Sequence, residues 1–172
     1  MPGPVTDARA YELRERYHAA FGGAELPVPV GAIAEDLLGL AVAERHDLAV
    51  SGMLLPAERK IFVNSKDVPA RRRFTLAHEV GHWVCQCLEG KGVPVMCRAE
   101  DVSESTDRTL EREANVFAAE LLMPEPAVRA EFAHDGDLAE RFGVSSEAMA
   151  WRLFNLGLVE ESPAAHLERV DS

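Results

Sequence analysis

The stretch Thr75-Leu-Ala-His-Glu-Val-Gly-His-Trp-Val84 contains the pattern His-Glu-x-x-His, and it governs what this chain can fold into. On a helix, side chains four residues apart lie on one face, so His78 and His82 can reach the same metal ion. Glu79 is rotated by about 100° from His78, which places its carboxylate beside such an ion rather than on it. There it can take a proton from a water molecule as a general base. The pattern predicts a metal centre with Glu79 as its catalytic residue.

The surroundings of this pattern favour a buried helix over an exposed one. A helical wheel places apolar side chains on one side, namely Leu76, Val80, Trp83, Val84 and Cys87. The polar and metal-ligating side chains fall on the opposite side. A tryptophan flanked by two valines is typical of a core position. The alternative, a surface helix with two solvated histidines, would not need these large apolar side chains.

A catalytic zinc site needs a third protein ligand and an open coordination position. The extended pattern HExxHxxGxxH would need glycine and histidine where the chain has Cys85 and Leu88, so that subclass is excluded. The helix expected after Thr109 offers three glutamates instead, namely Glu111, Glu113 and Glu120.

The helical wheel separates these glutamates. The apolar stripe of that helix is Leu110, Ala114, Phe117, Ala118, Leu121 and Leu122. Glu111 falls inside the stripe, where a carboxylate is costly unless it is paired or binds a metal, while Glu113 and Glu120 fall off one edge. We therefore expect Glu111 to be the third ligand and Glu113 to be the runner-up. The alternative for Glu111 is an acidic residue that the helix dipole favours. Asn115, one turn on, can accept the ring N–H of a ligand histidine and orient it.

Short apolar runs bounded by turn residues predict three strands, at Leu40–Glu44, Val50–Leu55 and Lys60–Asn64. Their short connections indicate a small antiparallel sheet. Helical periodicity predicts the remaining elements, at residues 6–21, 30–38, 70–88, 109–122, 126–134, 138–142 and 146–156. The fold class is therefore α+β: a mostly helical metallopeptidase fold with a three-stranded antiparallel sheet and a C-terminal helix-turn-helix-like unit.

The charge balance bears on partners and location. The chain has 172 residues and 18 basic against 29 acidic side chains, a net charge of −11. Such a surface is repelled by phosphate backbones and anionic membranes, so we expect no direct nucleic-acid or membrane partner. The three cysteines (Cys85, Cys87 and Cys97) form no CxxC pair, and the N-terminus has no apolar signal core. A cytoplasmic location is expected.

The stretches Arg72-Arg-Phe-Thr-Leu-Ala-His-Glu-Val-Gly-His82 and Glu111-Arg-Glu-Ala-Asn-Val-Phe-Ala-Ala-Glu-Leu-Leu-Met-Pro124 resemble the ImmA/IrrE metallopeptidases. The similarity covers most of residues 30–158. It implies a gluzincin-like peptidase with one zinc ion per chain, held by His78, His82 and Glu111, and with Glu79 as the acid/base. Mn²⁺ or Fe²⁺ would fit the same ligands. Gluzincins often carry aspartate where this chain has Asn115, which orients a histidine without adding charge.

Several members of that family cleave helix-turn-helix repressors and thereby induce mobile-element or stress genes. Because the chain leaves no room for an N-terminal DNA-binding domain, the resemblance implies a separately encoded repressor as substrate. We expect a metallopeptidase core at residues 1–134, the helix-turn-helix-like unit at 135–160 and a flexible tail at 161–172.

Two other functions compete with this one. A DNA-binding regulator would act through residues 138–156, but the expected reading helix carries one basic residue, Arg152, which favours a structural or protein-docking role. A non-hydrolytic zinc-bound adaptor is the third possibility, and the presence of Glu79 argues against it.

Overall fold

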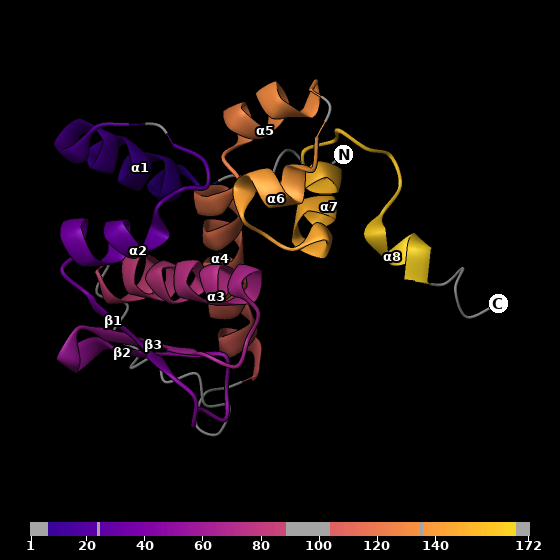
Figure 1. Ribbon diagram of the computed structural model, residues 1–172. Coiled ribbons are helices and arrows are strands. Elements are labelled where there is room, and N and C mark those ends of the chain that lie inside the picture. The colour runs from indigo at the N-terminus through magenta and orange to yellow at the C-terminus, as the bar shows by residue number, and fades with distance from the viewer. Residues whose placement is uncertain (1–6, 24, 89–103, 135, 168–172) are drawn as a thin grey trace.

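Three short strands form a single mixed sheet. The computed structural model describes residues 7–23, 25–88, 104–134 and 136–167 (Figure 1). Strands β1 (Ala41–Arg45), β2 (Gly52–Leu55) and β3 (Lys60–Asn64) lie in the order β1-β3-β2. Strand β3 runs antiparallel to β2 but parallel to β1.

The expectation of an antiparallel sheet is therefore wrong for one of its two pairings. Strands β2 and β3 form a tight hairpin, and β3 returns between β2 and β1 instead of outside them. The reason lies in burial, since Ile61 and Val63 of β3 are 0% and 4% exposed, while no residue of β1 is fully buried. Strand β3 takes the centre, where both of its edges are covered, and the more exposed strand β1 takes an edge.

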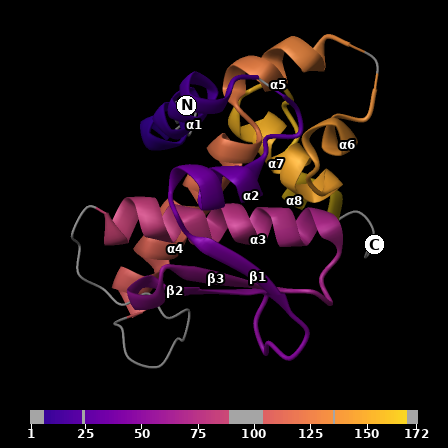
Figure 2. The same ribbon diagram turned by 60° about the vertical axis from the view of Figure 1, so that its left-hand side comes forward.

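Helix α3 (Pro69–His82) lies along the sheet, with the remaining helices on its other side (Figures 1 and 2). Pro69 occupies its first turn, where a backbone N–H would have no helical partner. The helix continues as a π-helical turn, Trp83–Cys87, so the predicted helix at 70–88 is confirmed in extent but not in its last turn. Leu76, Ala77 and Val80 are buried.

Helix α4 (Glu104–Leu122) packs closely against α3 and crosses it (Figure 1). Gly81 makes this approach possible, because a Cβ there would lie only 3.0 Å from the Ala114 carbonyl oxygen and 3.1 Å from a ring carbon of Phe117. Helix α4 begins at Glu104, five residues before the predicted helix at 109–122. Residues 89–103, which include Cys97, lie outside the described residues.

The other helices match the predicted segments to within a few residues. They are α1 (Ala8–Phe21), α2 (Val30–Ala32) with a following π-helical turn (Ile33–Leu37), α5 (Glu125–Phe132), α6 (Leu138–Phe142) and α7 (Ser146–Asn155). A further short helix, α8 (Pro163–Leu167), lies in the segment that was expected to be a flexible tail. A mostly helical α+β architecture is thus confirmed. No helix in the described ranges combines the length and apolar composition needed to cross a bilayer.

The C-terminal helices α6 and α7 are joined by a short turn at Gly143–Ser145. Gly143 adopts a left-handed conformation (φ +64°), and the Ser145 hydroxyl accepts a hydrogen bond from the Ala148 N–H at the start of α7. Phe142 and Met149 belong to the same continuous apolar cluster as the buried residues of α3 and α4. The boundaries drawn at 134 and 160 stay predictions.

Two arginines attach this helix pair to the centre of the molecule. Arg73 of α3 donates hydrogen bonds to the carbonyl oxygens of Gly143 (3.1 Å) and Val28 (2.9 Å). Arg152 of α7 donates to the Met123 carbonyl oxygen (2.9 Å) and pairs with Glu120 of α4. The C-terminal pair is therefore fixed to both helices that carry the predicted metal ligands.

Candidate metal centre

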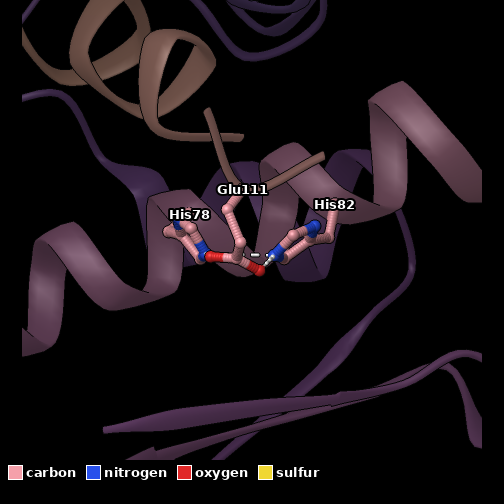
Figure 3. Close-up of side chains that lie close together, drawn as sticks. All are labelled: His78, His82 and Glu111. Atoms are coloured by element: carbon pink, nitrogen blue, oxygen red, sulfur yellow. Dashed lines mark hydrogen bonds and ion pairs between the residues drawn. The ribbon is translucent and has the colours of Figure 1, made fainter. Parts of the chain in front are cut away.

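The structure brings His78, His82 and Glu111 together between α3 and α4 (Figure 3). The two Nε2 atoms lie 3.0 Å apart. The Glu111 carboxylate lies between the rings, with one oxygen 3.1 Å from His78 Nε2 and the other 3.0 Å from His82 Nε2. One ligand atom from each residue falls within 4.8 Å of the others. That these three side chains bind a metal stays a prediction.

The other ring nitrogen of each histidine contacts an amide oxygen. His78 Nδ1 lies 2.9 Å from Asn115 Oδ1, and His82 Nδ1 lies 2.9 Å from Gln86 Oε1. Since an amide oxygen only accepts hydrogen bonds, each Nδ1 carries the proton, and in the neutral ring the Nε2 lone pair is left available. The Asn115 contact is the one that its helical spacing predicts.

Gln86 is a site residue that the sequence reasoning missed. It is fully buried, and its amide nitrogen donates to the carbonyl oxygen of Leu110 (3.2 Å), the residue before Glu111. One side chain thus touches a histidine on α3 and the backbone that carries the glutamate on α4. Its spacing of four residues from His82 was the signal that could have identified it.

The donor set fits a divalent metal ion. Two imidazole lone pairs and a carboxylate converge on one point, and such an arrangement is repulsive unless a proton or a cation sits among them. Two histidine nitrogens and one glutamate oxygen form a common ligand set of catalytic zinc, which leaves one coordination position open. The amide partners of the rings are the outer contacts that such ligands usually have.

The local electrostatics agree with strong coupling among these groups. Burial alone lowers the pKa of His82, but its hydrogen bond with Glu111 and the charges of Glu79 and Glu111 outweigh burial and raise it. Hydrogen bonds with His78 and then His82 hold the pKa of Glu111 well below its usual range, against the opposite effect of burial. Glu111 is therefore ionised whenever the protein is folded near neutral pH.

Glu79 lies on the side of α3 that faces the sheet and is only 2% exposed. Gly52 of β2 covers it: a Cβ at Gly52 would overlap the Thr75 methyl group and lie 3.1 Å from Glu79 Oε1. The glycine allows β2 to approach α3 closely enough to exclude solvent from the carboxylate. This role of Gly52 is not apparent from the sequence pattern.

The other two glutamates of α4 have their own partners. Glu113 pairs with Arg9 of α1 at 3.1 Å, and Glu120 lies among Arg14 and Arg152. Glu120 is only 4% exposed, although the helical wheel placed it off the apolar edge, because α1 and α7 cover that side of α4. Cys85 is buried and Cys87 is half-buried, as expected of core cysteines.

Comparison with known proteins gives consistent results. The peptidase family described as the IrrE N-terminal-like domain matches residues 38–154. The chain is 32% identical over 146 residues to the radiation response metalloprotease IrrE of Deinococcus radiodurans, covering 83% of this chain and 40% of that protein. It is 31% identical over 148 residues to the protein of the same name from Deinococcus deserti, covering 86% and 50%. The chain thus spans half or less of the length of these relatives.

A solved structure shares the fold. A Mycobacterium tuberculosis transcriptional regulator superposes with a TM-score of 0.64 at 21% identity, covering 85% of this chain and 46% of that one. At this identity the likeness extends to the fold alone.

Proposed function

The chain belongs to the family of IrrE N-terminal-like peptidases, and on that premise we propose that it is a zinc-dependent endopeptidase. The observation that carries the proposal is the convergence of His78 Nε2, His82 Nε2 and the Glu111 carboxylate, with both Nδ1 atoms facing amide oxygens. A buried carboxylate from the same helical turn, that of Glu79, supplies the acid/base group that hydrolysis requires.

Each side chain has a distinct part in the proposed reaction. When bound, a zinc ion polarises the scissile carbonyl and lowers the pKa of the attacking water. Asn115 and Gln86 keep the two imidazoles oriented as ligands. Glu79, covered by Gly52 and shielded from bulk solvent, takes the proton of the attacking water and delivers it to the departing amine.

We further propose that the substrate is a separately encoded helix-turn-helix repressor, whose cleavage induces mobile-element or stress genes. Two observations support this choice. The relatives are named radiation response metalloproteases, which links the family to a stress response. The net charge of −11 suits a basic partner, and DNA-binding proteins are typically basic.

The rival function, DNA binding through residues 138–156, has less support. This segment has two basic residues, Arg141 and Arg152. Arg152 is 3% exposed and pairs with Glu120, while Arg141 pairs with Glu131 at 3.2 Å. Arg141 belongs to α6 and its side chain is exposed, whereas α7 presents no basic side chain to solvent as a groove-reading helix does. Salt-dependent retardation of duplex DNA by the protein on a gel would support the DNA-binding function instead.

The test is the metal content of the protein, measured by elemental mass spectrometry on chains purified without added zinc. We expect about one zinc per chain in the wild type and in Glu79→Gln, and loss of zinc in His78→Ala and Glu111→Ala. Repressors encoded beside the gene would then be incubated with wild type and with Glu79→Gln. Cleavage by wild type alone supports the peptidase. If every variant retained zinc, the proposed ligand set would be wrong. If Glu79→Gln kept the biological activity unchanged, the non-hydrolytic adaptor would be favoured.

A further inference from the structure

A groove of about 500 Å³ runs along α4 between α4 and α7. Its apolar lining comes from three helices and the residue after α4: Phe74 of α3, Val116 and Ala119 of α4, Met123, and Ala148 and Trp151 of α7. We refer to it as the α4–α7 groove. Trp151, 38% exposed, is a large apolar side chain at its edge.

The groove begins at the candidate metal centre. Glu111 and Asn115, the third ligand and the partner of His78, also line it. Its α4 residues recur at spacings of three and four, so they form one face of that helix. The twelve steps along the chain from Glu111 to Met123 correspond to about 18 Å at the helical rise per residue. An extended peptide of about five residues has the same length.

Hydrogen bonds hold the walls of the groove together. Arg73 of α3 is hydrogen-bonded to the turn before α7, and Arg152 of α7 is hydrogen-bonded to Met123, the residue after α4. Arg108, Arg112 and Arg152 also line the groove, and Arg152 pairs with Glu120. The apolar part of the lining is suited to apolar side chains of a ligand.

We infer that the α4–α7 groove binds apolar side chains of the substrate on one side of the scissile bond, so that α7 forms part of the substrate-binding surface. This inference rests on the proposed peptidase function, because a substrate side chain would lie in the groove only if the scissile bond lies at the metal centre beside it. According to this inference, the C-terminal helix pair contributes to substrate selection. It predicts that cleavage sites have large apolar residues on one side of the scissile bond.

The experiment uses the zinc-loaded full chain and peptide hydroxamates, which anchor themselves on zinc. Leu-Phe and Gly-Gly hydroxamates are compared, with the chelating group at either the amino or the carboxyl end of the peptide. Affinity is measured by calorimetry. In one of the two polarities we expect the Leu-Phe ligand to bind at least about tenfold more tightly, since burial of large apolar side chains is worth at least this factor.

Two variants fill the groove from opposite walls, Ala119→Leu on α4 and Ala148→Leu on α7. Both should reduce the preference for Leu-Phe to less than about threefold, by occupying the volume that its side chains need. The matched control is Ala130→Leu, which makes the same change at an exposed position of α5 and should keep the preference. Zinc content should be equal in all four proteins.

A second readout is independent of affinity. Trp151 lines the groove, whereas Trp83 is buried beneath the sheet-facing helix at 7% exposure. Binding of the Leu-Phe ligand should change the tryptophan emission of the wild type and leave that of Trp151→Phe unchanged.

The outcomes separate the two proposals. If Gly-Gly and Leu-Phe ligands bind equally in both polarities, or if both groove variants keep the preference, the groove inference fails and the metal centre stands. If neither ligand binds the zinc-loaded chain, the proposed peptidase site itself fails, and the groove inference fails with it.

Discussion

Helix α4 carries two glutamates, nine residues apart, whose surroundings differ in kind. Glu111 is faced by two imidazole nitrogens, His78 Nε2 and His82 Nε2, at 3.1 and 3.0 Å. Glu120 is faced by two guanidinium groups, those of Arg14 from α1 and Arg152 from α7. All three members of the Glu120 cluster are at most 5% exposed.

The difference distinguishes a carboxylate that stabilises the fold, Glu120, from one with a proposed chemical role, Glu111. Guanidinium groups are always charged, so the Glu120 cluster carries its own counter-ions and is complete within the chain. It joins three helices that are distant in sequence. An imidazole whose Nδ1 proton points at an amide can offer its Nε2 lone pair when the ring is neutral, so the Glu111 cluster would be completed by a cation from outside. The same residue type, on the same helix, thus has a structural role at one position and a proposed ligand role at the other.

The largest expected effect comes from Glu111→Gln. Replacing the carboxylate by an amide removes one of three ligands and its charge, and we expect the zinc affinity to fall by about a thousandfold or more. The stability of the metal-free chain should change by less than about 1 kcal/mol. Competition with a chromophoric chelator and urea unfolding without metal measure the two quantities. Unchanged zinc affinity would contradict the ligand role.

The same substitution at Glu120 should give the opposite result. Glu120→Gln leaves two buried guanidinium groups without a compensating charge, which should cost about 3 kcal/mol in the free energy of unfolding. The zinc affinity of the folded protein should stay within about threefold of the wild type, because the cluster lies about 13 Å along the helix from Glu111. If Glu120→Gln lost zinc while keeping its stability, the contrast between the two clusters would be wrong.

A smaller effect is expected from the outer contacts of the histidines. Gln86→Leu removes the acceptor for His82 and the donor to Leu110 while keeping a similar volume. It should weaken zinc binding by about ten- to a hundredfold, as the loss of such contacts usually does. Asn115→Leu removes the acceptor for His78. Because Asn115 is exposed and Gln86 fully buried, water can replace the first more easily, and we expect Asn115→Leu to have the weaker effect.

The smallest effect concerns Glu113, the third glutamate of this comparison, which pairs with Arg9. Arg9 also pairs with Asp7 at 2.7 Å, and Asp7 caps helix α1. Burial acts to raise the pKa of Asp7, but the hydrogen bonds and charge of Arg9 outweigh it and lower the pKa. A lowered pKa stabilises the folded state above the unfolded-state pKa of about 4, and this contribution is lost as the pH falls through the folded-state value.

Asp7→Asn tests this charge without removing the cap, since asparagine caps helices equally well. We expect a loss of at most about 1 kcal/mol at pH 7, because Arg9 is partly exposed and solvent screens the pair. The difference from wild type should be smaller at about pH 3 than at pH 7, because protonation of Asp7 removes its charge. Urea unfolding at the two pH values measures it, and an equal difference at both would assign the effect to packing instead of charge.

The helical periodicity of the sequence predicted most residues of the candidate site. The spacing of His78 and His82 places both rings on one helix face in any fold, and the wheel of the later helix separated Glu111 from Glu113 through the cost of a carboxylate in an apolar stripe. Asn115 followed from the same turn. These inferences need only the helical period and the chemistry of the side chains.

The tertiary structure decided what depends on partners distant in sequence. The central place of β3 depends on how the strands pair, and no strand's own sequence specifies its neighbours. The helical wheel placed Glu120 off the apolar edge, yet it is buried with Arg14 and Arg152, which lie 106 and 32 residues away in the sequence. The contact of Gly52 with Glu79 and the groove between α4 and α7 likewise arise only when separate elements pack.

The sequence by itself thus determined the helices, the ligand spacing and the family resemblance, because these reside in short-range periodicity. Only the tertiary structure determined which charges are paired and what surrounds the proposed metal, because those depend on contacts that form when distant segments exclude water together.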